Sequence, residues 1–145
     1  MGRARASLWV CESCGRAFAN RNQSHACGRW TLDRHFAGKP AVVLEIYDRF
    51  LKMVEEFGPV TVLPEKTRIA FQVRMSFAQL TIRRHWVLGH LVLAQRVESA
   101  LFTKVESFSP RNHAHHFRLD GQEQVETLKP YVREAYAVGR QEHLG

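Results

Sequence analysis

Apolar positions along this chain follow two different periods, and the period changes near residue 60. Between Pro40 and Gly58 they recur about every three to four residues, which predicts one amphipathic helix with a single buried face. Pro40 suits the first turn of that helix, and Gly58 followed by Pro59 ends it. The side chains on the expected buried face are Val43, Ile46, Tyr47, Phe50, Val54 and Phe57.

From residue 60 to residue 119 apolar and polar positions alternate, which is typical of β-strands with one buried face. In the segment 68–75 this alternation predicts that Arg68, Gln72 and Arg74 point away from the core. The connections between strands are short, so we expect mostly antiparallel pairing. The strand-like segments are 60–63, 69–75 with a continuation over 78–82, 87–94, 103–108 and 115–119.

The C-terminal part returns to a helical period. Asp120 and Glu123 have the spacing of a capping box, and apolar residues from Val125 to Val138 recur at helical spacing. Pro130 interrupts this pattern, which predicts either a kink or two short helices that meet there. The expected fold is therefore α+β, with helices packed on one face of an antiparallel sheet of about five strands.

The three cysteines lie close together near the N-terminus. Cys11 and Cys14 have the two-residue gap that directs two thiolates to one metal ion, and His25 and Cys27 add two further ligands. A closed Cys3His set is typical of structural zinc, because it leaves no coordination position for a substrate. His35 is an alternative fourth ligand. We therefore expect a zinc-binding hook over residues 1–30, followed by an α+β domain over residues 31–145.

The formal net charge is +7, from 21 Lys plus Arg against 14 Asp plus Glu. An excess of this kind attracts polyanions, which makes nucleic acid or another phosphate-rich partner a candidate ligand. The alternative is an ordinary polar face that only contacts water. The candidate anion-binding residues, most of them on the expected outward face of the sheet, are Lys66, Arg68, Arg74, Arg83, His116 and Arg118.

Three histidines and an arginine gather in the segment 109–116. Together with Lys66 and Arg74, the His113–His116 segment gives an alternative hypothesis, an enzyme or a small-anion-binding domain that uses acid–base chemistry. The sequence contains no nucleophile elbow, glycine-rich phosphate loop or zinc-protease helix, so no catalytic residue is assigned. A third hypothesis is a protein-interaction domain.

No stretch of the sequence approaches the roughly 20 continuous apolar residues that a membrane-spanning helix requires. The apolar run Leu8–Val10 is too short for the core of a signal peptide. We therefore expect a cytoplasmic protein without a membrane partner.

Three short motifs resemble one bacterial family. They are the run from Pro64 to Ala78, the sequence His116-Phe-Arg-Leu, and Arg133-Glu-Ala-Tyr136. In this order they resemble the proteins grouped as domain of unknown function 5655, over residues 40–142. The knuckle sequence from Trp9 to Cys27 resembles the N-terminal extension of one branch of that family. The resemblance implies a compact α+β domain with recurring Lys66, Arg74, Phe77, His116, Arg118 and Tyr136, and it carries over no reaction and no substrate.

Overall fold

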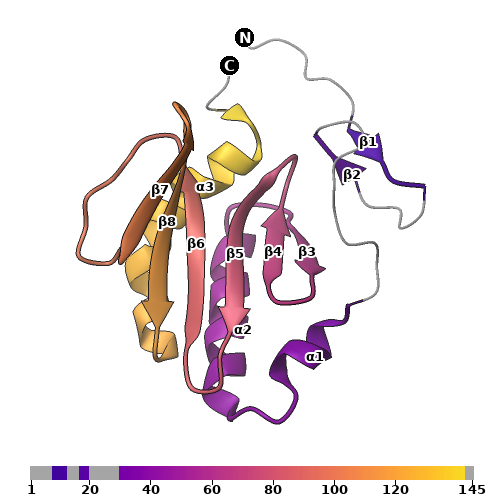
Figure 1. Ribbon diagram of the computed structural model, residues 1–145, viewed down its shortest axis with the longest axis vertical. Helices are drawn as coiled ribbons and strands as arrows, with labels where there is room; N and C mark the ends of the chain where they lie inside the picture. The colour runs from indigo at the N-terminus through magenta and orange to yellow at the C-terminus, as the bar shows by residue number, and fades with distance from the viewer. Residues whose placement is uncertain (1–7, 13–16, 20–29, 143–145) are drawn as a thin grey trace.

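The computed structural model describes residues 8–12, 17–19 and 30–142 (Figure 1). A short hairpin of two strands comes first, followed by two helices, six strands and a C-terminal helical region. The elements are β1 (Trp9–Val10), β2 (Ala17–Phe18), α1 (Leu32–Phe36), α2 (Ala41–Glu55), β3 (Thr61–Pro64), β4 (Ile69–Gln72), β5 (Ser76–Ile82), β6 (Val87–Leu93), β7 (Lys104–Ser109), β8 (Asn112–Leu119), the 3-10 helix η1 (Gln122–Leu128) and α3 (Lys129–Gly139).

The main sheet has the strand order β3-β4-β5-β6-β8-β7, and every neighbouring pair is antiparallel. The predicted α+β class and the antiparallel sheet are confirmed, but the expected number of about five strands is one too few in the described chain. The alternation of apolar and polar residues continues across residues 69–82 and does not reveal the turn at residues 73–75. This turn divides the segment into β4 and β5. Strand β8 lies between β6 and β7, so the chain passes over one strand position after β6.

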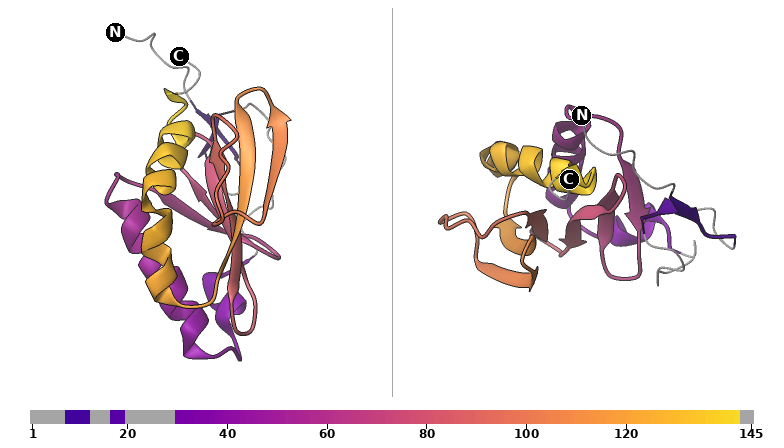
Figure 2. Two further views of the ribbon diagram at one scale, coloured as in Figure 1. Left: turned by 90° about the vertical axis from the view of Figure 1, so that its left-hand side faces the viewer. Right: turned by 90° about the horizontal axis from the view of Figure 1, so that it is seen from above.

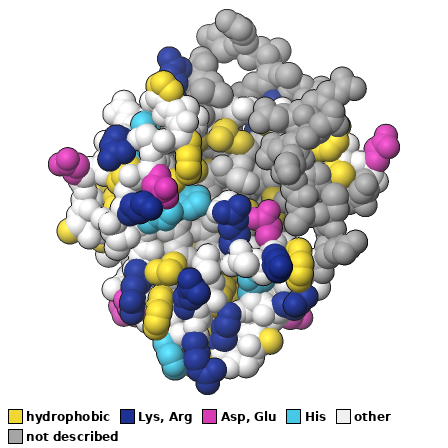
Figure 3. Space-filling view, viewed as in Figure 1, with side chains coloured by type: hydrophobic (Ala, Val, Ile, Leu, Met, Phe, Trp, Pro, Cys, Tyr) yellow, Lys and Arg dark blue, Asp and Glu magenta, His cyan; other side chains and the backbone are white. Residues whose placement is uncertain are grey.

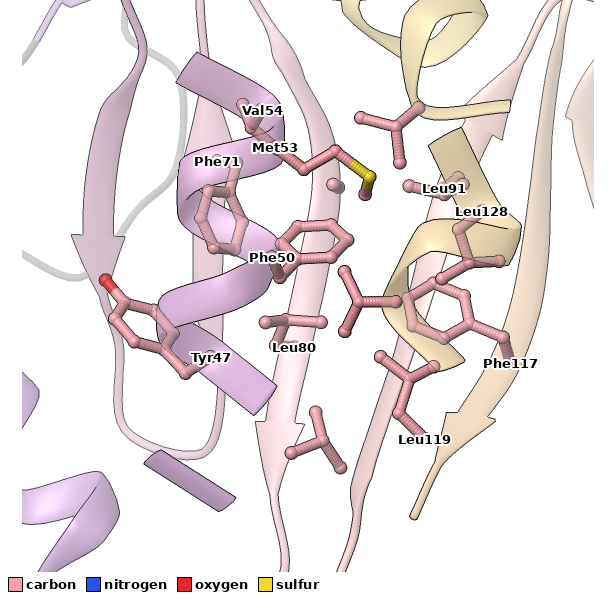
Figure 4. Packing of buried hydrophobic residues seen from close by; sticks show 14 of the residues in the cluster. Tyr47, Phe50, Met53, Val54, Phe71, Leu80, Leu91, Phe117, Leu119 and Leu128 are labelled. Atoms are coloured by element: carbon pink, nitrogen blue, oxygen red, sulfur yellow. The ribbon is translucent and has the colours of Figure 1, made fainter. Parts of the chain in front are cut away.

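Helices α2 and α3 cover one face of the sheet and leave the other face open, as the edge-on view of Figure 2 shows. The core lies between these two layers. In Figure 4 the aromatic rings of Tyr47 and Phe50 on α2 point toward the sheet. The ring of Phe50 lies edge-on to that of Phe71, at a centroid separation of 5.1 Å, and stacks near that of Phe117.

Helix α2 follows the sequence prediction closely. Its buried residues Val43, Ile46, Tyr47, Phe50, Met53 and Val54 form one stripe. Gly58 has φ +143°, a conformation that residues with a Cβ rarely adopt, and the missing Cβ leaves room for the hydroxyl group of Tyr136. That hydroxyl donates a hydrogen bond to the carbonyl of Pro59, at 2.7 Å. The end of α2 is therefore held against α3.

The C-terminal helical region is divided at Pro130, as predicted. The 3-10 helix η1 ends at Leu128, and Pro130 lies in the first turn of α3, where its missing N–H breaks no helical hydrogen bond. At the other end of α3, the carbonyl of Gly139 accepts hydrogen bonds from the backbone N–H groups of Arg74 and Met75. The last turn of α3 thereby fixes the turn between β4 and β5.

The hairpin of β1 and β2 pairs Val10 with Ala17 and lies next to β4. The side-chain amide of Gln72 donates a hydrogen bond to the backbone carbonyl of Ala17, and Gln72 is only 4% exposed. Gln72 was expected to lie on the outward, exposed face of the sheet. That expectation of exposure is wrong, because the hairpin covers this part of β4.

Candidate anion-binding face

The face of the sheet opposite α2 and α3 is called the open face below. Its side chains alternate with the core residues of the same strands, so that Gln79 and Thr81 of β5 point away from buried Ala78, Leu80 and Ile82. Figure 3 shows Lys and Arg side chains gathered over the lower half of this face, with few acidic side chains among them. The predicted basic face therefore exists as a surface feature of the described chain.

One row of polar residues crosses four strands of the open face. The strand registers pair Gln79 with His90, His90 with His116, and His116 with Lys104. This row crosses the floor of a hollow of about 390 Å³, called the central hollow below. The lining residues are Arg68, Gln79, Thr81, Leu88, Gly89, His90, Thr103, Lys104, His116 and Phe117.

The charges in the central hollow are partly balanced. His116 Nε2 donates a hydrogen bond to the Glu106 carboxylate at 2.7 Å, and Lys104 Nζ lies 3.6 Å from the same group. The hydrogen bond from His116, followed by the charge of Lys104, holds the pKa of Glu106 below its usual value. Arg68 forms an ion pair with Glu65 at 3.3 Å.

His90 lies edge-on to His116, with ring centroids 5.2 Å apart. Burial is the main reason that the pKa of His90 falls to about 4, and the nearby charges of His116 and Arg68 lower it further. His90 is therefore uncharged near pH 7. It contributes a neutral, hydrogen-bonding ring to the hollow instead of a positive charge.

Arg118 lies beyond this row on β8. Its guanidinium group lies 4.3 Å from the centre of the Trp86 ring and forms an ion pair with Asp120 at 2.8 Å. Both interactions leave the guanidinium at the surface, with the side chain 48% exposed. One face of Trp86 is thus covered by a cation that belongs to the same surface.

A second hollow, of about 470 Å³, lies between α1 and the end of β5 and is called the α1 hollow below. It shares Thr81 with the central hollow. Its lining residues are Arg34, His35, Lys39, Lys66, Thr67, Thr81, Ile82 and Arg83. The structure therefore brings the predicted residues Lys66 and Arg83 into one hollow, and Arg68 and His116 into its neighbour.

Arg74, in contrast, belongs to neither hollow. It lies in the turn between β4 and β5, where its Nε donates a hydrogen bond to the side chain of Gln141 at 2.9 Å. The alternative hypothesis of an acid–base site requires Lys66, Arg74 and His116 around one substrate. The structure does not bring these three residues together.

The histidines of the segment 113–116 have different surroundings. His115 is fully buried; its Nδ1 donates a hydrogen bond to the carbonyl of His113, and its Nε2 accepts one from the N–H of Val97. The ring nitrogens of His113 contact the hydroxyl of Ser107 and the carbonyl of Pro110. Both rings therefore hold backbone segments in place, and of the three histidines only His116 lines a described hollow.

Of the four predicted zinc ligands, Cys11 belongs to the described chain, while Cys14, His25 and Cys27 lie outside the described residues. Cys11 directly follows β1 and is 6% exposed. His35, the alternative ligand, uses Nε2 to donate a hydrogen bond to the carbonyl of Glu65 at 2.7 Å. Within residues 8–12, 17–19 and 30–142, no group of three potential ligands is placed to hold a metal ion.

Sequence reasoning missed two cations of the α1 hollow. No role in binding was assigned to Arg34 or Lys39 from the sequence. Neither residue alternates with core residues on a strand or belongs to a family motif, the two features that indicated the other cations. Lys39 follows Gly38, whose φ of +72° turns the chain, and its Nζ reaches the hollow through a hydrogen bond to the carbonyl of Ile82 at the end of β5.

The fold and this face define a small α+β domain that presents a basic surface on an antiparallel sheet. No described helix is both long enough and apolar enough to cross a membrane. The sequence model of the family described as Domain of unknown function (DUF5655) matches residues 32–139, so the chain belongs to that family. Comparisons with curated proteins and with solved structures gave no match.

The six residues that the family resemblance singled out divide into two groups in the structure. Phe77 and Tyr136 pack together, with ring centroids 5.5 Å apart, and Arg74 lies in the turn that α3 closes. Lys66 and His116 line the two hollows, and Arg118 lies on the same strand as His116. The first group contributes to the packing of α3 and the turn between β4 and β5, and the second lies at the open face.

Proposed function

We propose that this protein is a binding module that holds nucleic acid on the open face of its sheet. The observation that carries this proposal is the arrangement of cations in two adjoining hollows that share Thr81. Phosphate groups supply most of the affinity of proteins for nucleic acids, and they are bound by Lys, Arg and hydroxyl or amide donors. The two hollows offer this combination of groups.

The balance of charge on the open face supports this proposal. The carboxylates of Glu65, Glu106 and Asp120 each pair with a cation of the face. In contrast, Arg34, Lys39, Lys66 and Arg83 have no ion pair with a carboxylate among the described residues. The positive charge that remains is therefore concentrated near the α1 hollow.

Polar side chains that carry no charge complete the surface. Gln79, Thr81 and Thr103 line the central hollow together with the neutral ring of His90. Such groups donate and accept hydrogen bonds with sugars and base edges as well as with phosphates. The proposal does not specify a base sequence.

A structural zinc ion is part of this proposal. Cys11 and Cys14 would be two of its ligands, and the pairing of Val10 with Ala17 brings together the two ends of the segment that contains them. His25 and Cys27 would complete a closed set, which suits structural zinc. The zinc-bound hook would then fix the chain against β4, where Ala17 accepts the hydrogen bond from Gln72.

The test is the binding of single-stranded and double-stranded RNA and DNA, measured by fluorescence anisotropy at two salt concentrations. Affinity is expected to fall steeply with salt, because each phosphate contact releases counterions. Arg68→Gln is expected to weaken binding to all sequences and to reduce the slope of log K against log salt by about 1.

Arg49→Gln is the matched control. Arg49 also forms an ion pair with a glutamate, Glu126, but it lies on α2 and therefore on the other side of the sheet. This variant should bind as the unchanged protein does. Absence of binding to any of the four nucleic acids at low salt would refute the proposal.

A further inference from the structure

The α1 hollow differs from the central hollow in its charge. Four cations line it, Arg34, Lys39, Lys66 and Arg83, together with the threonines Thr67 and Thr81. They come from four separate segments: α1, the loop between α1 and α2, the turn between β3 and β4, and the turn that follows β5. A concentration of positive charge from distant segments destabilises a fold unless an anion balances it.

Among the described residues, no carboxylate forms an ion pair with any of these four cations. Every ion pair of the open face lies elsewhere, on Arg68, Lys104, His116 or Arg118. Arg34 instead stacks over the ring of Trp30, at 4.7 Å from its centre. The glutamate nearest along the chain, Glu65, pairs with Arg68 through its carboxylate and with His35 through its carbonyl.

Lys39 is held in position for a ligand. Its Nζ donates hydrogen bonds to the carbonyls of His35, at 2.6 Å, and Ile82, at 2.7 Å. An ammonium group has three donors, so one remains for an anion in the hollow. Burial, followed by the charge of Arg83, lowers the pKa of Lys39, and a bound anion would reverse the second of these effects.

We propose that the α1 hollow binds a phosphate monoester, and that in the polymer held by the open face this group is a terminal phosphate. This inference rests on the proposed function, and it names the part of the ligand that this hollow recognises. A terminal phosphate carries a charge of about −1.5 to −2, whereas each phosphodiester carries about −1. The larger charge and the extra oxygen match a site with several converging cations and two hydroxyl groups.

The position of the α1 hollow suits the end of a nucleic-acid strand. Thr81 connects it to the central hollow, so a chain whose terminal phosphate lies beside α1 continues across β5 and β6. The volume of about 470 Å³ exceeds that of one phosphate group and leaves space for the first sugar. The same phosphate chemistry occurs in small free phosphomonoesters, and the experiment distinguishes the two sources.

The experiment compares oligonucleotides of one sequence that carry a 5′-phosphate, a 3′-phosphate or only hydroxyl ends, with anisotropy as the readout. We expect one of the phosphorylated forms to bind roughly tenfold more tightly than the hydroxyl form, as added charge-assisted hydrogen bonds allow. Lys66→Gln and Arg83→Gln should each remove most of this difference. Both side chains are exposed, so neither change should affect folding.

Lys52→Gln, at an exposed position of α2, removes the same charge from the other side of the sheet and should keep the difference. If all three oligonucleotides bind equally well, this inference is refuted while the proposed function remains. If none binds, titration with inorganic phosphate and a nucleoside monophosphate, followed by NMR of the Thr67 and Thr81 amides, decides between the sources. Shifts that Lys66→Gln abolishes would support a site for small phosphomonoesters, and unchanged spectra would refute the inference.

Discussion

Histidine illustrates how strongly the surroundings of a single residue determine its chemistry in this protein. His115 is buried with both ring nitrogens engaged by the backbone, and burial is also the main cause of its lowered pKa. His116, the next residue, points to the other face and contacts Glu106. Along the sequence these two look like one cluster. On a strand, however, neighbouring side chains point in opposite directions.

His90 leads to a prediction about the effect of pH on stability. Its pKa lies at about 4 in the folded protein against 6.5 in an unfolded chain, so the folded state disfavours the charged form. The stabilisation from this group is complete above pH 6.5 and is lost as the pH falls toward 4. The shift corresponds to a loss of about 3 kcal/mol in the free energy of unfolding. Urea unfolding at several pH values measures it.

The groups that face His90 are His116, Arg68 and Glu106, and other residues also titrate in this range. The comparison is therefore between the unchanged protein and His90→Gln, whose stability should fall less between pH 6.5 and 4. His85→Gln, at an exposed position in the turn after β5, should behave as the unchanged protein does. Parallel curves for the unchanged protein and His90→Gln would contradict the assignment of a lowered pKa to His90.

At the scale of elements, the sequence was most informative where one period continues without interruption. The predicted helix after Pro40 is α2, and the division at Pro130 separates η1 from α3. Prediction was weaker where a second element changes the surroundings of the first. The alternating pattern correctly predicted that Gln72 lies on the face of β4 opposite the helices. It contained no information about the hairpin that covers that position.

The same limit applies to the candidate site. Lys66, Arg68, Arg83 and His116 were found from exposed positions and from the family motifs, and all four line a hollow. Arg74 was grouped with them because it belongs to the same alternating pattern. The turn at residues 73–75 and the hydrogen bond from the Arg74 backbone to Gly139 remove it from that surface. Local alternation cannot reveal a contact between residues so far apart in the chain.

The contact between α3 and β5 yields a prediction at this scale. A Cβ at position 139 would lie 2.5 Å from the ring of Phe77, which is fully buried. Gly139→Ala is therefore expected to lower the free energy of unfolding by about 1–3 kcal/mol, although alanine alone favours a helix by roughly 1 kcal/mol. Chemical denaturation measures the change.

A second substitution separates this steric effect from a change of the helix itself. If the ring of Phe77 is the obstacle, Phe77→Leu should cost less stability in the Gly139→Ala background than in the unchanged protein. Additive losses in this double-mutant cycle would show that the two positions do not interact.

Considered as a whole, the molecule contains two parts of different character. Residues 32–139 have their own core and match the family, whereas the segment before residue 30 has few apolar side chains. If this segment binds zinc as proposed, it is expected to gain much of its order from the metal, because ligand binding and chain ordering occur together. The zinc prediction therefore concerns the N-terminal segment alone.

We expect one zinc ion per chain by elemental analysis of the purified protein. Cys11→Ser or Cys27→Ser should lose the metal, and a chelator should make residues 8–30 sensitive to protease while residues 40–142 stay resistant. His25→Ala should weaken zinc binding more than His35→Ala, because Nε2 of His35 already contacts the carbonyl of Glu65. Protein that lacks stoichiometric metal but keeps a protected N-terminus would contradict this prediction.

Helix α3, whose Gly139 carbonyl accepts hydrogen bonds from Arg74 and Met75, is the last element of the described chain. This position has a consequence for the synthesis of the protein. Synthesis on the ribosome proceeds from the N-terminus, so all six strands of the sheet leave the exit tunnel before α3 does. Until then the apolar surfaces of β5 and β6 that α3 later covers stay exposed on the nascent chain. Because such surfaces bind chaperones and favour aggregation, a premature stop before Gly139 would release a polypeptide that cells are expected to degrade.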